Sequence, residues 1–108
     1  MRRGEIWTVS AGGYAGKPRP ALIIQDDHFD STASITIAVF TTDPTEAPLF
    51  RLEFQPNETN GLRVSSRLMV DEITTVSKGN LGAEIGGLRD EDMVRVNRAI
   101  AVFLGLAG

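Results

Sequence analysis

The chain has 108 residues, a length expected to form one domain over residues 1–108 with a core that needs no covalent staples. Its 11 basic and 14 acidic side chains give a net charge of −3, which excludes a polycationic protein, so a nucleic-acid partner would require a local basic patch. Because the chain has no cysteine and no apolar run long enough for a membrane span or a signal peptide, we expect a cytoplasmic protein without disulfides or a membrane partner.

Five segments carry the alternating or continuously apolar pattern that is typical of β-strands: residues 5–9, 20–25, 33–42, 49–55 and 67–73. Loops rich in glycine and proline separate them. Asn60-Gly61 is the strongest hairpin-turn signal of the chain, because both residues tolerate a positive φ. The glycine-rich residues 74–87 are expected to hold one short strand or a turn.

From about Asp90 the apolar residues change to a helical period, and one stripe contains Met93, Val96, Ile100, Phe103 and Leu104. Acidic residues fill the first turn, where the helix dipole favours anions, and Gly105 is a natural stop. Short strands followed by one amphipathic helix predict a mainly β fold with a C-terminal α-helix, in the form of a small SH3-like β-barrel. Such a fold does not by itself specify a function.

Lys17-Pro18-Arg19-Pro20 leads into the second predicted strand. Each proline fixes its own φ and holds the preceding residue extended, so Arg19 is a stiffly mounted guanidinium at the mouth of a buried strand. From the residues alone, a surface ion pair of little energetic value is the simpler interpretation of Arg19. For Thr41, the simpler interpretation is a β-prone residue at the end of a strand.

Six short motifs occur in register over nearly the whole chain. They are Gly4-Glu5-Ile6-Trp7, the run from Arg19 to Asp26, Ala38-Val39-Phe40-Thr41, Gly61-Leu62 with Ser66, the run from Asp71 to Val76 with Lys78 and Leu81, and Ile85-Gly86-Gly87-Leu88 with the helix end at residues 104–106. Together they resemble the MazF/PemK-type toxins of bacterial toxin–antitoxin modules, and the fold that this resemblance implies is the CcdB/PemK-like barrel.

The resemblance implies a type II toxin that needs no metal or cofactor and cuts single-stranded RNA at specific sequences, chiefly mRNA, with tRNA or rRNA as alternatives. It implies attack of the ribose 2′-hydroxyl on the adjacent phosphorus, which leaves a 2′,3′-cyclic phosphate and a 5′-hydroxyl. By position, Arg19 matches the family's catalytic arginine and Thr41 its catalytic threonine. A fixed guanidinium suits the oxygens of a phosphorane, and a threonine hydroxyl can orient the phosphate for in-line attack.

The expected substrate-binding residues are Tyr14, Lys17, Thr42, Ser66, Arg67 and Asp71. A local basic patch is expected from Lys17, Arg19, Arg63 and Arg67. Asp71 is a candidate proton acceptor or reader of a base edge, and the alternative is a structural carboxylate paired with Arg67. The resemblance also implies a homodimer with RNA in the groove between protomers, and a cognate antitoxin whose acidic, apolar segment competes for the same cations.

The chain departs from the family pattern at three places. Tyr14-Ala15-Gly16-Lys17 stands where the family often has an acidic residue, and Met69 stands where some members have arginine. Pro18 replaces the usual arrangement in which a glycine lies two residues before the arginine. The general base therefore stays open.

Two other classes remain as alternatives. A CcdB-like DNA gyrase inhibitor would act through an aromatic, apolar C-terminal tail, which Leu106-Ala107-Gly108 does not supply. A non-catalytic SH3-like binding module would line its groove with several aromatic residues, and this chain has only one tryptophan, one tyrosine and five phenylalanines.

Overall fold

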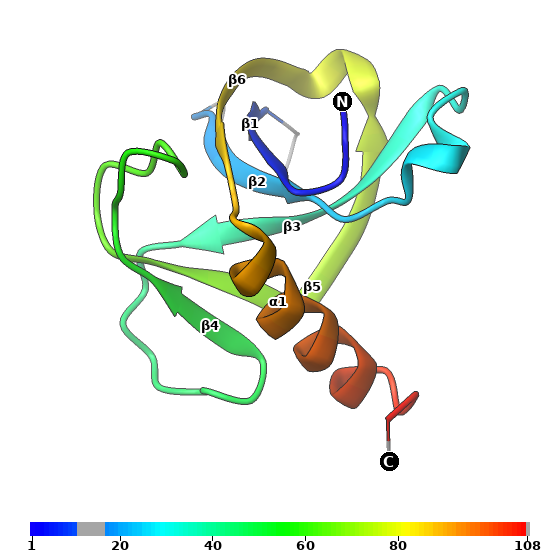
Figure 1. The fold of residues 1–108 in the computed structure, drawn as a ribbon. Helices are drawn as coiled ribbons and strands as arrows, with labels where there is room; N and C mark the ends of the chain where they lie inside the picture. Colours follow the sequence, from blue (N-terminus) through cyan, green and yellow to red (C-terminus); the bar gives the residue numbers. More distant parts are fainter. Residues whose placement is uncertain (11–16, 108) are drawn as a thin grey trace.

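The computed structural model describes residues 1–10 and 17–107. These residues form six strands and one α-helix (Figure 1). The elements are β1 (Glu5–Val9), β2 (Arg19–Ile23), β3 (Ser34–Thr41), β4 (Arg51–Phe54), β5 (Ser66–Ser77), β6 (Leu81–Gly87) and α1 (Asp90–Phe103), with the short 3-10 helices η2 (Asp27–Phe29) and η3 (Lys78–Asn80) between strands. The predicted mainly β fold with a C-terminal helix is confirmed.

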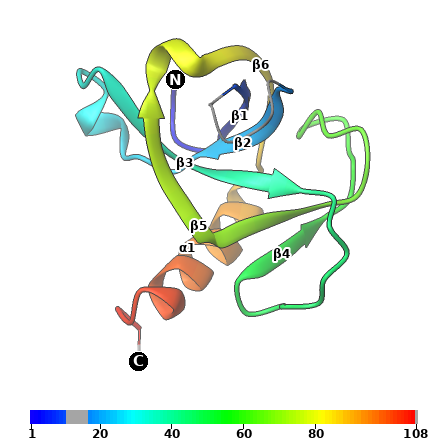
Figure 2. The same ribbon diagram turned by 180° about the vertical axis from the view of Figure 1, so that it is seen from behind.

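The six strands form one antiparallel sheet in the order β4-β5-β3-β2-β1-β6. Figures 1 and 2 show that this sheet curls strongly, with β1, β2 and β6 gathered at one end and β4 at the other. A closed barrel would require the two edge strands to pair. In the described part of the chain β4 and β6 are not neighbours, so the sheet of this SH3-like fold stays open.

The sheet buries apolar residues on both faces. One face packs beneath α1 around Leu22, Phe40 and Leu68, and the other is enclosed by the curled strands around Ile23 and Ile37. This double burial explains why residues 21–24 of the second predicted strand and residues 37–40 of the third are continuous apolar runs. The interiors of β2 and β3 are therefore buried in the core, while Arg19 begins β2 and Thr41 ends β3 at the edge of that core.

The strand β5 is longer than the sequence predicts. It continues through Ser77 because its pairing with β3 runs from Thr41 opposite Arg67 to Ser34 opposite Ser77. Within the glycine-rich residues 74–87, the expected short strand is β6, which pairs with β1.

The prediction of a hairpin turn at Asn60-Gly61 is wrong. The two residues lie inside the connection between β4 and β5, which spans residues 55–65. The Asn60 side chain is buried, and it accepts hydrogen bonds from the backbone N–H groups of Asn57 and Leu62 and donates one to the Gln55 carbonyl. The pair thus orders a long connection instead of closing a tight turn.

The helix α1 confirms most of the predicted apolar stripe. Val96 is buried, and Met93 and Ile100 pack against the core below the sheet. Phe103 and Leu104 lie farther along the helix and remain 45% and 56% exposed, so the end of the stripe is surface.

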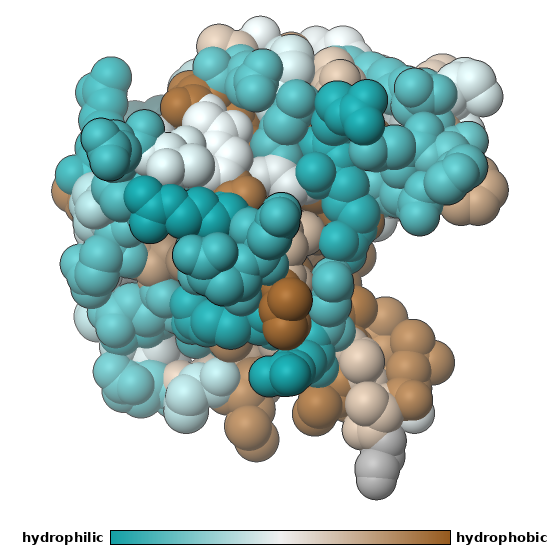
Figure 3. Space-filling view, in the orientation of Figure 1, coloured by the Kyte–Doolittle hydropathy of each residue, from teal (hydrophilic) through white to brown (hydrophobic). Residues whose placement is uncertain are grey.

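Exposed apolar side chains gather around the C-terminal end of α1, and we call them the apolar patch: Val102, Phe103, Leu104 and Leu106. Figure 3 shows apolar surface in this region, at the lower right. The rings of Phe50 and Phe103 lie 5.8 Å apart and join the patch to the sheet. Across the described residues, the structure contains no helix with the length and apolar character needed to span a membrane.

Candidate functional site

The pairing of β2 with β3 brings Arg19 and Thr41 to the same edge of the sheet. In this antiparallel pair Ala21 lies opposite Val39. Two residues before Ala21 is Arg19, and two residues after Val39 is Thr41, so the start of β2 faces the end of β3. Both residues line two hollows that meet at this edge. The structure therefore brings together the two residues expected to be catalytic.

The first hollow, which we call the basic cleft, has a volume of about 540 Å³. Its described lining contains three cations, Lys17, Arg19 and Arg63, and no carboxylate. Apolar side chains form its walls and floor, among them Phe40 and Leu62. A site with this lining attracts an anion although the whole chain is acidic.

The second hollow, which we call the mixed-charge hollow, has a volume of about 680 Å³. Its lining is Arg19, Thr41, Thr42, Asp43, Pro44, Arg51, Met69 and Glu72. It shares Arg19, Thr41 and Thr42 with the basic cleft. These three residues therefore form the border between two spaces of different charge.

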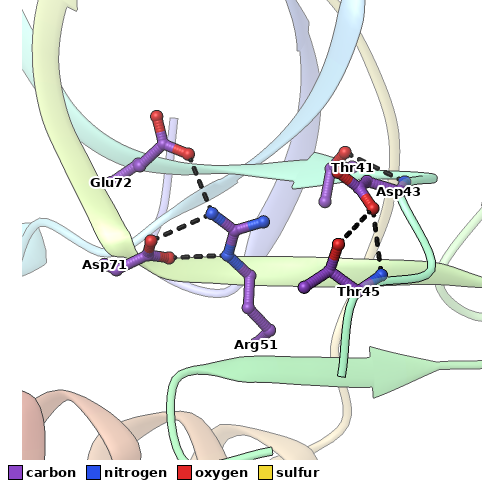
Figure 4. Close-up of polar contacts among 6 residues, drawn as sticks. All are labelled: Thr41, Asp43, Thr45, Arg51, Asp71 and Glu72. Carbon is purple, nitrogen blue, oxygen red and sulfur yellow. Dashed lines mark hydrogen bonds and ion pairs between the residues drawn. The ribbon is translucent and has the colours of Figure 1, made fainter. Parts of the chain in front are cut away.

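The hydroxyl of Thr41 is oriented by the chain that follows it. Its Oγ1 accepts a hydrogen bond of 3.1 Å from the backbone N–H of Asp43. The Asp43 carboxylate accepts in turn from the N–H and hydroxyl of Thr45, and these two bonds hold the pKa of Asp43 below its usual range (Figure 4). With the oxygen of Thr41 already accepting from the backbone, its proton is available to donate to a ligand.

Arg67 lies outside the linings of both hollows. Its guanidinium is only 14% exposed, lies 3.1 Å from Glu46 and 3.7 Å from Glu53, and donates to the Asp43 carbonyl at 3.2 Å. It therefore fastens the connection between β3 and β4, including the residue whose N–H orients Thr41.

Asp71 is paired with Arg51, and the alternative of a pair with Arg67 is wrong. Arg51 donates from Nε at 2.8 Å and from Nη2 at 2.9 Å to the two carboxylate oxygens of Asp71, and from Nη2 at 3.2 Å to Glu72. The hydrogen bonds from Arg51 hold the pKa of Asp71 below its usual range. A carboxylate with both oxygens engaged and a lowered pKa is a weak proton acceptor.

The remaining candidate substrate-binding residues include exposed residues that line the basic cleft and one buried residue that supports its wall. Lys17 and Thr42 are exposed and line the basic cleft. Ser66 also lines it, but this residue is only 5% exposed and its hydroxyl donates to the Val64 carbonyl. Tyr14 lies outside the described residues. Among the residues that are described, no three His, Cys, Asp or Glu side chains form a group that could hold a metal ion.

The connection that carries Arg63 is fixed by close backbone packing. Gly61 has a φ of +68°, and a Cβ at this position would lie 1.9 Å from the carbonyl oxygen of Ile85. Only glycine fits such an approach. Together with the buried Asn60 amide, this contact holds the wall of the basic cleft in one shape.

Residues 2–104 match the family model described as PemK-like, MazF-like toxin of type II toxin-antitoxin system. The chain is 54% identical over 109 residues to a probable endoribonuclease MazF from Mycolicibacterium smegmatis, with 100% of each chain covered. It is 27% identical to the endoribonuclease MazF9 from Mycobacterium tuberculosis, with 98% of each covered.

A solved mycobacterial endoribonuclease in complex with its cognate antitoxin superposes with a TM-score of 0.81 at 25% identity, and the match covers 100% of this chain and 98% of the other. The MazE-MazF structure from Deinococcus radiodurans, at 15% identity, a TM-score of 0.77 and coverage of 99% and 97%, shares the fold. The family model spans nearly all of the chain, which therefore belongs to the PemK-like, MazF-like toxins of type II toxin–antitoxin systems.

Proposed function

We propose that this chain is a growth-inhibiting toxin that acts in the cytoplasm as a metal-independent, sequence-specific endoribonuclease on single-stranded RNA. The observation that carries the proposal is the meeting of Arg19 and Thr41 at the border between the basic cleft and the mixed-charge hollow. The endoribonuclease names of the mycobacterial relatives support the same activity.

The reaction we propose is a transesterification within the RNA. The ribose 2′-oxygen bonds to the adjacent phosphorus as it loses its proton, and the bond from phosphorus to the 5′-oxygen breaks as that oxygen gains one. The Arg19 guanidinium stabilises the additional negative charge of the phosphorane with parallel hydrogen bonds. The hydroxyl of Thr41 donates a hydrogen bond to the same phosphate and holds the phosphate in line for attack.

The residues around this pair then have two kinds of role. Lys17 and Thr42 contact the RNA directly, and Arg63 joins them as a third cation of the basic cleft. Ser66 and Arg67 act on the substrate through the backbone that they fasten. A single strand suits the site because its unstacked bases can enter hollows that a duplex cannot reach.

We also propose a homodimer and an antitoxin partner. The apolar patch is the surface we assign to the second copy, because four exposed apolar residues around one helix end favour burial against another protein. An antitoxin segment with acidic side chains would bind the cations of the basic cleft and so exclude RNA. A solved relative is described as a complex with its cognate antitoxin.

The test is incubation of the purified chain with mRNA, tRNA and rRNA in the presence of EDTA. We expect discrete cuts whose 5′ ends accept phosphate directly from a polynucleotide kinase, and whose 3′ ends can be tailed only after the cyclic phosphate is removed. Cleavage that starts only when Mg²⁺ is restored would refute metal independence.

Two results would favour the other classes. Inhibition of DNA gyrase supercoiling without RNA cleavage would support the CcdB-like alternative. RNA or peptide binding without any cleavage would support a non-catalytic module.

A further inference from the structure

The two hollows that meet at Arg19 and Thr41 differ in charge. The basic cleft has three cations in its described lining, whereas the mixed-charge hollow balances Arg19 and Arg51 against Asp43 and Glu72. A phosphate group is attracted to the first space, whereas in the second the carboxylates offset the attraction of the arginines. The balanced charge of the mixed-charge hollow therefore suits a neutral group that carries hydrogen-bond donors of its own.

Polar atoms with open hydrogen-bonding capacity line the mixed-charge hollow. Asp43 uses Oδ1 for both bonds to Thr45, and Glu72 uses Oε2 for Arg51. Within the described residues, Asp43 Oδ2, Glu72 Oε1 and Arg51 Nη1 have no hydrogen-bond partner. Figure 4 shows Arg51 reaching from β4 between Asp71 and Glu72 on one side and Thr41 and Asp43 on the other.

The donor in this array is held in place. Arg51 is 17% exposed and its bidentate partner Asp71 is 20% exposed, so the guanidinium cannot turn without breaking two charge-assisted hydrogen bonds. Pro44 and Met69 add apolar contact surface to the same space. Fixed donors and acceptors beside an apolar wall match a flat nucleobase, which presents both kinds of group along one edge.

We propose that the mixed-charge hollow is a base-reading subsite for a nucleotide next to the scissile phosphate, and that it selects a base with an exocyclic amino group. Asp43 and Glu72 accept hydrogen bonds from the amino group, and Arg51 donates a hydrogen bond to a ring nitrogen or carbonyl next to that amino group. Ionised carboxylates can only accept, so uracil, which has no amino group, binds less well. This inference rests on the proposed ribonuclease function.

The experiment removes single amino groups from an RNA. The cleavage site is first mapped on one oligonucleotide, and each amino base beside it is then replaced by the analogue that lacks only the amino group: purine for adenine, inosine for guanine or 2-pyrimidinone for cytosine. Single-turnover rates are measured for the wild type, Glu72→Gln and Asp43→Asn. Glu91→Gln is the matched control, because Glu91 is an exposed glutamate in the first turn of α1, away from both hollows.

At one of the two flanking positions, we expect loss of the amino group to slow the wild type and Glu91→Gln by about 5- to 150-fold. The same deletion should have much less effect in Glu72→Gln or Asp43→Asn, because the acceptor has already been replaced. Glu72 is 59% exposed, so its variant is expected to fold, and circular dichroism checks both variants.

Three results of these cleavage measurements would overturn the base-reading subsite. A wild type that cleaves but tolerates amino deletion at both flanking positions overturns the base-reading subsite and leaves the proposed function standing. An equal penalty in all four proteins also overturns it, because the carboxylates then do not read the base. A wild type that cleaves no RNA refutes the proposed function, and this inference falls with it.

Discussion

Substitution of Arg19 separates its proposed catalytic role from a structural one. The residue is exposed at the first position of β2, before the buried Ala21-Leu22-Ile23, so its side chain contributes little to the core. We expect Arg19→Ala to change the free energy of unfolding by no more than about 1 kcal/mol, because the polar interactions of an exposed charged side chain contribute little to stability. If Arg19 stabilises the phosphorane, the same change should lower the cleavage rate by about 10²–10³, or about 3–4 kcal/mol.

Arg19→Lys sharpens this test. Lysine keeps the charge but cannot form the two parallel hydrogen bonds of a guanidinium, so most of the rate should be lost. Binding of RNA should weaken much less than the rate, because the missing contact is strongest in the transition state.

The assay is single-turnover cleavage of one oligonucleotide, with RNA affinity measured separately by fluorescence anisotropy. Arg98→Ala, which removes an exposed arginine of α1, is the control for loss of one positive charge. A folded Arg19→Ala protein that cleaves at the wild-type rate would refute the catalytic assignment.

Three further measurements test other parts of the structure. Asn60→Ala should lower the free energy of unfolding by about 1–3 kcal/mol in urea denaturation, because the buried Leu62 N–H loses its acceptor. Arg63→Ala should reduce the salt dependence of RNA binding by about 0.7 in the log–log slope, the value expected for one phosphate contact on a single strand. Arg51 lowers the pKa of Asp71, so this pair stabilises the fold above the unfolded pKa of about 4 and stops doing so as pH falls through the folded pKa. Asp71→Asn should therefore be less stable than the wild type at pH 7, with a smaller difference at pH 3.

Each of these predictions has a result that contradicts it. Asn60→Ala as stable as the exposed-site control Glu58→Ala would mean that the connection orders itself without the amide. An unchanged salt slope in Arg63→Ala would place the phosphate path elsewhere. A stability difference for Asp71→Asn that persists at pH 3 would show that packing, not charge, makes residue 71 important.

The strands and the helix could be predicted because their signals are local. Alternation within residues 5–9 and the stripe of α1 reflect which side of one element faces the core. Even so, β5 extends to Ser77 because β3 continues to pair with it, and that partner is not visible in the sequence of β5 itself.

The errors have a common physical origin in contacts between distant segments. Asn60-Gly61 has the residues of a hairpin turn, yet the glycine is required by the carbonyl of Ile85 on another strand. The alternative pair of Asp71 with Arg67 ignores strand geometry, because residues four apart on a strand are about 13 Å apart. Arg51 reaches Asp71 from the neighbouring strand β4, where it lies opposite Met69, and only the register between the strands reveals that neighbour.

The two proposed catalytic residues could be predicted from the family resemblance, but not from local residue patterns. Arg19 and Thr41 each have an ordinary structural interpretation, and only the resemblance to a toxin family joined them. The structure adds the independent reason that Ala21 lies opposite Val39, which brings the two polar ends to one edge. The mixed-charge hollow had no such signal, because its walls come from β2, from the end of β3 and the residues after it, from β4 and from β5.

Pairing of several carboxylates with arginines reconciles an acidic chain with the proposed RNA substrate. The net charge is −3, but Glu46 and Glu53 lie beside Arg67, and Asp71 lies beside Arg51. The described lining of the basic cleft contains cations without a carboxylate, so a phosphate at its mouth meets a positive local field. Because the field changes from positive to balanced across the border formed by Arg19, Thr41 and Thr42, one strand of RNA can keep its backbone on the basic side and turn a base to the other. The charge boundary and the proposed reaction centre thus coincide.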